Sequence, residues 1–129
     1  MNALGTDGKI PKKGILEIDY ESPMTLEHYK GEFAVRRKSL EDEGKVSQML
    51  HILTNGTEIV DTPTRVRLTA IANLSIVVEE YPDWWEEVQE FADTATIIHV
   101  FSKYTEWQLR PFRERRKLKE EEEKSTKSG

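Results

Sequence analysis

Two adjacent tryptophans, Trp84 and Trp85, restrict the fold of this chain more than any other feature of its sequence. They follow a Tyr-Pro-Asp segment, and the third tryptophan of the chain is Trp107. Neighbouring side chains on a helix point about 100° apart, so the two rings cannot share one narrow packing stripe. Either the pair contacts two different packing partners, or one ring stays exposed as a binding anchor. The second alternative is typical of a protein that acts by contacting other proteins.

Composition limits the size of the hydrophobic core. The chain has 129 residues, which suits one domain, and 36% of them are hydrophobic whereas 33% are charged. We therefore expect a modest core together with long solvated faces or arms. The net charge of −5 and the pI near 5.3 disfavour a general nucleic-acid-binding protein.

The sequence contains no cysteine, which excludes disulfides, thiolate zinc sites and cysteine nucleophiles. Its first residues lack the apolar segment of a secretory signal, and no apolar run is long enough to span a bilayer. We therefore expect a soluble cytosolic protein that makes no membrane contact.

The N-terminal region predicts an arm or a short β-ribbon. Residues 1–14 are rich in glycine and polar groups, which is typical of a flexible arm. Residues 14–20 and 29–37 alternate apolar and charged side chains, which favours two strands. An isolated two-stranded ribbon is only marginally stable in water. We therefore expect it to pack on helices of this chain or on another subunit.

Capping residues predict a first helix that begins after Ser39 and stops at Asn55-Gly56. A second helix begins near Thr62, which we expect to be its cap, with a proline in the first turn. This helix carries an apolar stripe, which predicts that it is the central buried helix. The stripe consists of Val66, Ala70, Leu74, Val77 and Val78.

A short amphipathic turn is expected around the tryptophan pair, and Asp93-Thr94 should cap a last helix. Pro111 should kink that helix or end it near Leu109. The fold class predicted is mainly α, a small domain of about four helices with an N-terminal arm or short β-ribbon. The predicted division is residues 1–38 for the arm or ribbon, 39–112 for the helical domain and 113–129 for a charged, partly disordered tail.

No catalytic, cofactor-binding or metal-binding motif is found. His28, His51 and His99 show no metal-ligand spacing, and the chain has neither a phosphate-binding glycine loop nor a nucleophile elbow. We therefore expect a protein without enzymatic activity.

Charged residues gather in two places. Six acidic residues surround the tryptophan pair, either as a solvated rim or as a patch that steers a basic partner. A basic cluster at residues 110–119 favours nucleic-acid binding as a third hypothesis, but residues 120–123 are all glutamate and cancel most of its field. Within this cluster only Phe112 offers a ring for base stacking.

Tryptophan and arginine are the commonest hot-spot residues of protein interfaces, and they supply most of our candidates for protein-binding residues. The candidate anchors, which would insert into a partner, are Trp84, Trp85, Trp107, Phe33 and Tyr29. The candidate rim residues, which would lie at the edge of the interface, are Arg36, Arg110 and Arg113.

The order of several short motifs resembles a known family. The motifs are Gly31-x-Phe33-x-Val35-Arg36-Arg37, Ser39-Leu40-x-Asp42, Arg67-x-x-Ala70 with Leu74, Pro82-x-Trp84-Trp85, Tyr104-x-x-Trp107 and Phe112-Arg113. Between Tyr29 and Arg113 the chain resembles small proteins encoded among the tail genes of long-tailed bacteriophages, especially the tail assembly chaperone type.

The resemblance implies a mostly helical protein without catalytic residues that binds the extended tape-measure protein and helps to recruit tail-tube subunits in the host cytoplasm. The long segment before Tyr29 departs from this pattern and would also suit a structural subunit of the tail, neck or baseplate that stays in the virion. Expected partners are tape-measure, tube or baseplate subunits, and a homo-oligomer also fits.

Overall fold

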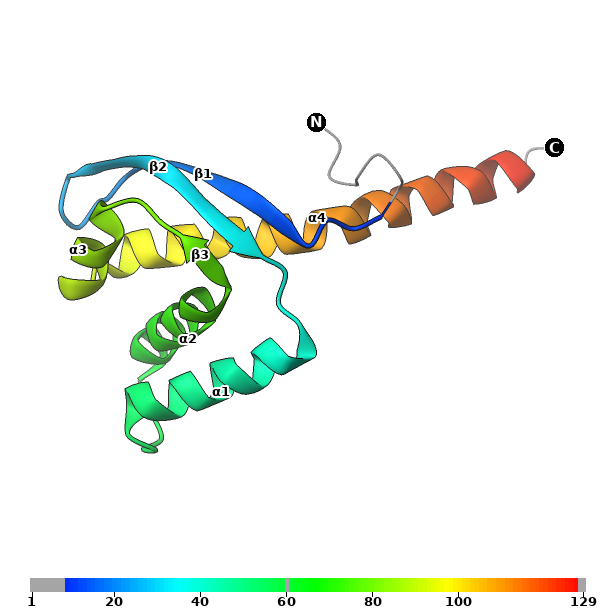
Figure 1. Cartoon of the computed structure of the whole chain (residues 1–129). Helices are drawn as coiled ribbons and strands as arrows, with labels where there is room; N and C mark the ends of the chain where they lie inside the picture. Colours follow the sequence, from blue (N-terminus) through cyan, green and yellow to red (C-terminus); the bar gives the residue numbers. More distant parts are fainter. Residues whose placement is uncertain (1–8, 60, 128–129) are drawn as a thin grey trace.

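The structure is a computed structural model, and it describes residues 9–59 and 61–127 (Figure 1). Within these ranges it contains four helices and three strands. The predicted class, mainly α with about four helices and a short ribbon, is confirmed in its helical part, and the three-stranded antiparallel sheet makes the fold mixed rather than purely helical. The elements are β1 (Lys13–Glu21), β2 (His28–Arg36), α1 (Leu40–Thr54), α2 (Thr62–Val77), β3 (Val78–Glu80), α3 (Trp84–Glu90) and α4 (Thr94–Lys127).

The N-terminal ribbon is formed within one chain. Strands β1 and β2 pair antiparallel, with Leu16 opposite Phe33. Because side chains alternate between the two faces of a strand, one face of the ribbon is apolar and buried. That face carries Leu16, Ile18, Phe33 and Val35, each at most 4% exposed. The arm predicted for residues 1–8 lies outside the described residues.

The third strand was missed by the sequence prediction. Val78 was placed on the stripe of the second helix, but α2 ends at Val77 and Val78 begins β3. β3 pairs antiparallel with β2, with Val78 opposite Val35. The backbone groups at the open edge of β2 thus find partners in β3, which a continued helix would not supply.

The predicted start and stop of the first helix are confirmed. The Ser39 hydroxyl accepts a hydrogen bond from the Asp42 amide at 3.2 Å, and the Asp42 carboxylate accepts one from the Ser39 amide at 3.0 Å. This reciprocal pair is a capping box. Asn55 ends α1 in the left-handed conformation, with φ of 54°.

The second helix is capped one residue earlier than predicted. The Asp61 carboxylate, rather than Thr62, accepts a hydrogen bond from the Thr64 amide at 3.0 Å. The buried part of α2 lies in its second half, and Val66 is 45% exposed, contrary to the prediction that it faces the core. The first half of α2 therefore leaves an apolar side chain at the surface.

Helix α4 begins at the predicted cap, where the Asp93 carboxylate accepts a hydrogen bond from the Thr96 amide at 3.2 Å. It does not end near Leu109 but continues through Pro111 to Lys127. A proline removes one helical hydrogen bond. Pro111 is fully buried, and the Arg37 guanidinium donates to the Gln108 carbonyl at 2.6 Å close to this point. Of the two predicted outcomes, an end near Leu109 is therefore wrong, and packing and this donor support the helix at the proline.

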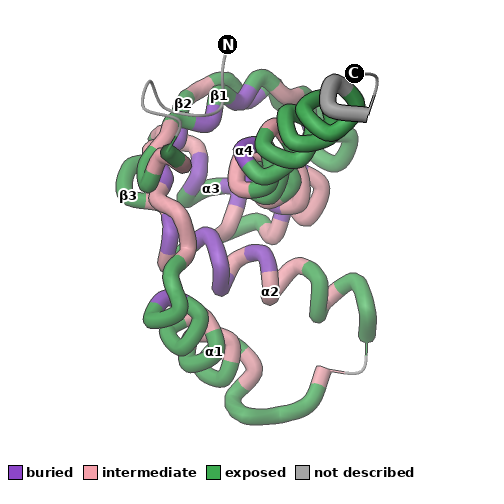
Figure 2. The backbone as a smooth tube through the Cα atoms, turned by 90° about the vertical axis from the view of Figure 1, so that its right-hand side faces the viewer, coloured by how far each residue is buried: buried purple, intermediate pink, exposed green. Residues whose placement is uncertain are grey.

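The elements form successive layers around one core (Figure 1). Helix α4 runs along the β1–β2 ribbon, α2 lies on the other side of α4, and α1 packs outermost on α2. Figure 2 shows that buried residues gather where the ribbon, α2, α3 and α4 meet, whereas most of α1 and the C-terminal part of α4 are exposed. The domain boundaries expected at residues 38/39 and 112/113 stay a prediction, although ribbon and helices share this core.

We predict that Gly14→Ala destabilises the fold by about 1–3 kcal/mol, because an added methyl group overpacks a filled site. A Cβ at Gly14 would lie 2.5 Å from Trp107 Nε1. The control is Gly44→Ala in α1, where no atom lies within 4 Å of an added Cβ. That change should stabilise by about 0.5–1 kcal/mol, since alanine restricts the unfolded chain. Chemical denaturation measures both, and equal effects of the two changes would contradict the packing.

Candidate functional site

Four of the candidate anchors form one aromatic cluster between the sheet and α3. The Phe33 ring lies 5.1 Å from the Trp85 ring and 5.6 Å from the Trp84 ring, measured between centroids. Tyr29 lies 4.8 Å from Trp84. The indole nitrogen of Trp84 donates to the Lys30 carbonyl at 3.1 Å. The adjacent tryptophans thus pack on different sides, Trp85 toward the core and Trp84 at its edge.

Burial limits what these rings offer to a partner. Phe33, Tyr29 and Trp85 are 0%, 7% and 4% exposed, whereas Trp84 is half-buried. Large aromatic side chains that are buried together stabilise a core by their area and by edge-to-face contact. Their role as anchors stays a prediction, and Trp84 is the member of this cluster with exposed surface.

Trp107 lies in a second aromatic group, against Tyr104 with ring centroids 5.8 Å apart. The Arg37 guanidinium carbon stands 4.8 Å above the Trp107 ring, which is a cation–π contact. The Tyr104 hydroxyl donates to the Arg36 carbonyl at 2.9 Å, and burial raises the Tyr104 pKa to about 12. Trp107 is half-buried, so one part of its indole faces solvent.

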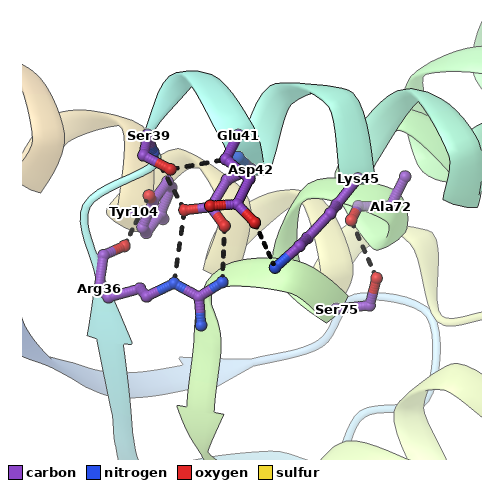
Figure 3. A network of polar contacts seen from close by, with 8 residues as sticks. All are labelled: Arg36, Ser39, Glu41, Asp42, Lys45, Ala72, Ser75 and Tyr104. Atoms are coloured by element: carbon purple, nitrogen blue, oxygen red, sulfur yellow. Dashed lines mark hydrogen bonds and ion pairs between the residues drawn. The ribbon is translucent and has the colours of Figure 1, made fainter.

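Arg36, a predicted rim residue, is engaged within the chain (Figure 3). Its guanidinium donates to the Asp42 carboxylate at 2.7 Å, and Asp42 is also the partner of Ser39 in the capping box. The hydrogen bond from Arg36, then that from the Ser39 amide, holds the pKa of Asp42 well below its usual range. Arg36 thus connects the end of β2 to the start of α1.

Arg37 has a structural role that the sequence did not assign. It donates to the Pro11 carbonyl at 3.1 Å and to the Gln108 carbonyl at 2.6 Å, so it ties β2 to the segment before β1 and to α4. Burial lowers the pKa of Arg37. The only sequence signal was its place in a run of three cations after a strand, which does not identify partners this far away.

The two remaining rim candidates lie on the exposed part of α4. Arg110 donates to Glu106 at 3.2 Å, one helical turn earlier. Arg113 lies at the surface and lines a shallow groove of about 420 Å³. The structure does not bring Arg110 and Arg113 together with the aromatic cluster around Phe33. Arg113 lines the groove, and Arg110 lies on the same helix close to it.

This groove, which we call the α2–α4 groove, is mainly apolar. It is lined by Val66 of α2 and, from α4, by Ile98, Phe101, Ser102, Thr105, Glu106, Leu109 and Arg113. Val66 and Leu109 are 45% and 42% exposed. The sequence signal for it was a second stripe on α4, since Ile98, Phe101 and Leu109 follow helical spacing beside the core stripe.

Two of the three histidines make contacts with side chains of the β1–β2 ribbon. The His99 ring stacks on Tyr20 with centroids 4.0 Å apart, and burial lowers the His99 pKa. His28 contacts the Asp19 carboxylate across the ribbon. Among the residues that the structure describes, no group of three or more metal-ligating side chains is present.

We predict that Asp42→Asn lowers the free energy of unfolding by about 1–3 kcal/mol at pH 7, because hydrogen bonds to a charged carboxylate are strong. The folded pKa lies below the unfolded value of about 3.9, so this stabilisation is present above pH 4 and is lost as the pH falls toward the folded pKa. Urea denaturation from pH 7 to pH 2.5 should show wild type and variant converging only below about pH 4.

The control is Glu41→Gln in the same first turn, where the acid is 82% exposed and lies 3.7 Å from Lys45. Exposed pairs of this kind contribute well under about 1 kcal/mol. A loss for Glu41→Gln equal to that for Asp42→Asn would contradict the special role of Asp42.

Within residues 9–59 and 61–127, no helix combines the length and the apolar content that crossing a membrane requires. Comparison of the chain with protein-family models, with curated proteins and with solved structures found no match.

Proposed function

We propose that this protein acts by binding other proteins rather than by catalysis, as a chaperone in bacteriophage tail assembly. The observation that carries the binding proposal is the α2–α4 groove, an apolar surface on a strongly charged molecule. Exposed apolar side chains that line one groove, with charges at its edge, are the usual composition of a protein interface. The assignment to phage tails comes from the order of motifs between Tyr29 and Arg113.

The shape of the groove favours a helical partner segment. Two helices form its walls, and Val66 stands across from the Ile98–Leu109 stripe. An amphipathic helix that places apolar side chains at positions i, i+3 or i+4 and i+7 fits a groove of this kind. If the partner is the tape-measure protein, as the resemblance implies, this proposal requires an amphipathic helical segment of it to bind here.

The charges at the edge of the groove set orientation. Arg113 lies at one end and the Glu106–Arg110 ion pair lies beside it. Charged rims contribute more to register and to the rejection of wrong partners than to affinity. A partner helix with an acidic residue near Arg113 would therefore be preferred over one with a basic residue.

A structural subunit of the tail, neck or baseplate is the alternative, because the same groove would serve a permanent contact. Mass spectrometry of purified virions separates the two: a stoichiometric amount of this chain supports the subunit, and its absence supports the chaperone. Retention on DNA at low salt that neutralisation of the arginines abolishes would instead support the nucleic-acid hypothesis.

We predict that Leu109→Lys and Val66→Lys each weaken binding of the tape-measure protein at least tenfold, because each removes apolar contact and places a charge in the groove. The control is Ile52→Lys, which changes an equally apolar residue, 65% exposed on α1 and outside the groove. Because all three side chains are exposed, the free energy of unfolding of each variant should differ from that of the wild type by less than about 0.5 kcal/mol.

Co-expression of each variant with the tape-measure protein, followed by pull-down and measurement of the soluble fraction, gives the readout. Unchanged capture by both groove variants, or equal loss with Ile52→Lys, would contradict the groove as the binding site.

A further inference from the structure

The C-terminal half of α4 carries its charges in two blocks. Residues 115–119 contain four cations and one leucine, and residues 120–123 are four glutamates. Every side chain from 115 to 124 is exposed. Figure 1 shows this part of the helix projecting past the sheet and the other helices. From residue 112 to the end of α4 at Lys127 the projection is roughly 24 Å long, at 1.5 Å per residue.

Within one helix this charge order gives both unfavourable and favourable neighbours. Arg115 and Lys119 are like charges four residues apart, which is unfavourable. Pairs such as Arg116 with Glu120 have the cation before the anion, the weaker order for intrahelical pairing. Glu120 with Lys124 has the stronger order, with the anion first, so the single helix combines favourable and unfavourable pairs.

One face of the projecting helix concentrates both blocks. Its residues follow the steps i, i+3, i+4, i+7, i+10 and i+11, which place them on one side of a helix. They are Phe112, Arg115, Arg116, Lys119, Glu122 and Glu123, and all six are exposed.

We propose that this face pairs antiparallel with the same face of a second copy of the chain, about a two-fold axis at Lys119. This register places Arg115 opposite Glu123 of the second copy and Arg116 opposite its Glu122. Twofold symmetry repeats both pairs, and on this face only Lys119 meets a like charge, its own copy. A parallel pair would instead place each block against an identical block.

An antiparallel partner adds intermolecular pairs to those within each helix. It brings the cations of one copy beside the glutamates of the other, and the two helix dipoles oppose one another. The helix is clear of the α2–α4 groove in this region, so the pairing does not depend on the proposed function. Because exposed ion pairs are weak and screened by salt, we expect association that is strong only at low ionic strength.

Charge reversal tests the pairing. The first quadruple variant makes the segment basic throughout by combining Glu120→Lys, Glu121→Lys, Glu122→Lys and Glu123→Lys. The second quadruple variant makes it acidic throughout by combining Arg115→Glu, Arg116→Glu, Lys117→Glu and Lys119→Glu. Sedimentation of the full chain at 50 mM salt should show at least tenfold weaker self-association for each variant alone. A mixture of the two should associate again, and 500 mM salt should dissociate both the wild type and the mixture.

Association that is absent in the wild type, or that survives both reversals, would overturn the proposal. A wild-type chain that stays monomeric with this segment helical by circular dichroism would show that the helix stands alone. Leu109→Lys in the α2–α4 groove should leave self-association unchanged, which separates this surface from the proposed binding site.

Cysteine cross-linking tests the register, because the chain has no cysteine of its own. Lys119→Cys should form a disulfide-linked dimer rapidly under mild oxidation. Arg115→Cys and Glu123→Cys should cross-link with each other in a mixture at least tenfold faster than either does alone. The control is Lys117→Cys, exposed but on another side of the helix. Equal rates for Lys117→Cys and Lys119→Cys would overturn the antiparallel register.

Discussion

The packing of Phe33 against the tryptophan pair joins the sheet to the helices, and most of the core depends on it. Phe33 is fully buried, and both indoles contact its ring. A two-stranded ribbon alone is marginally stable in water. Its apolar face becomes a core only because α3 and α4 cover it, with Ile97, Val100 and Tyr104 completing the interior. The ribbon is thus a part of the core of this chain.

This use of the rings changes where a partner can bind. Trp85, Tyr29 and Phe33 fill the interior, and Arg36 and Arg37 hold β2 to α1 and α4. Two surfaces that remain are the apolar groove between α2 and α4 and the charged projection of α4. We propose the first for an amphipathic helix of a partner and the second for a second copy of this chain. A small core that uses most of its aromatics internally leaves aliphatic stripes and charges for recognition.

Helix boundaries were predictable where local hydrogen bonds set them. Ser39, Asn55 and Asp93 each act within three or four residues, and the structure confirms them. The ribbon followed from alternation of side chains in residues 14–20 and 29–37. Predictions were wrong where a distant contact overrides local preference. Val78 leaves the helix to pair with β2, and Pro111 stays inside α4 because packing and Arg37 support the backbone there.

The sequence by itself determined the local features of this protein: the helix caps, the alternating strands, the apolar stripes and the two charge blocks of α4. These depend on residues a few positions apart, so spacing is sufficient to find them. Only the tertiary structure decided which indole lies at the surface and that Val66 and Leu109 line one groove. Those outcomes depend on which elements pack together, because a stripe becomes core or surface only when a neighbouring element covers it or leaves it open.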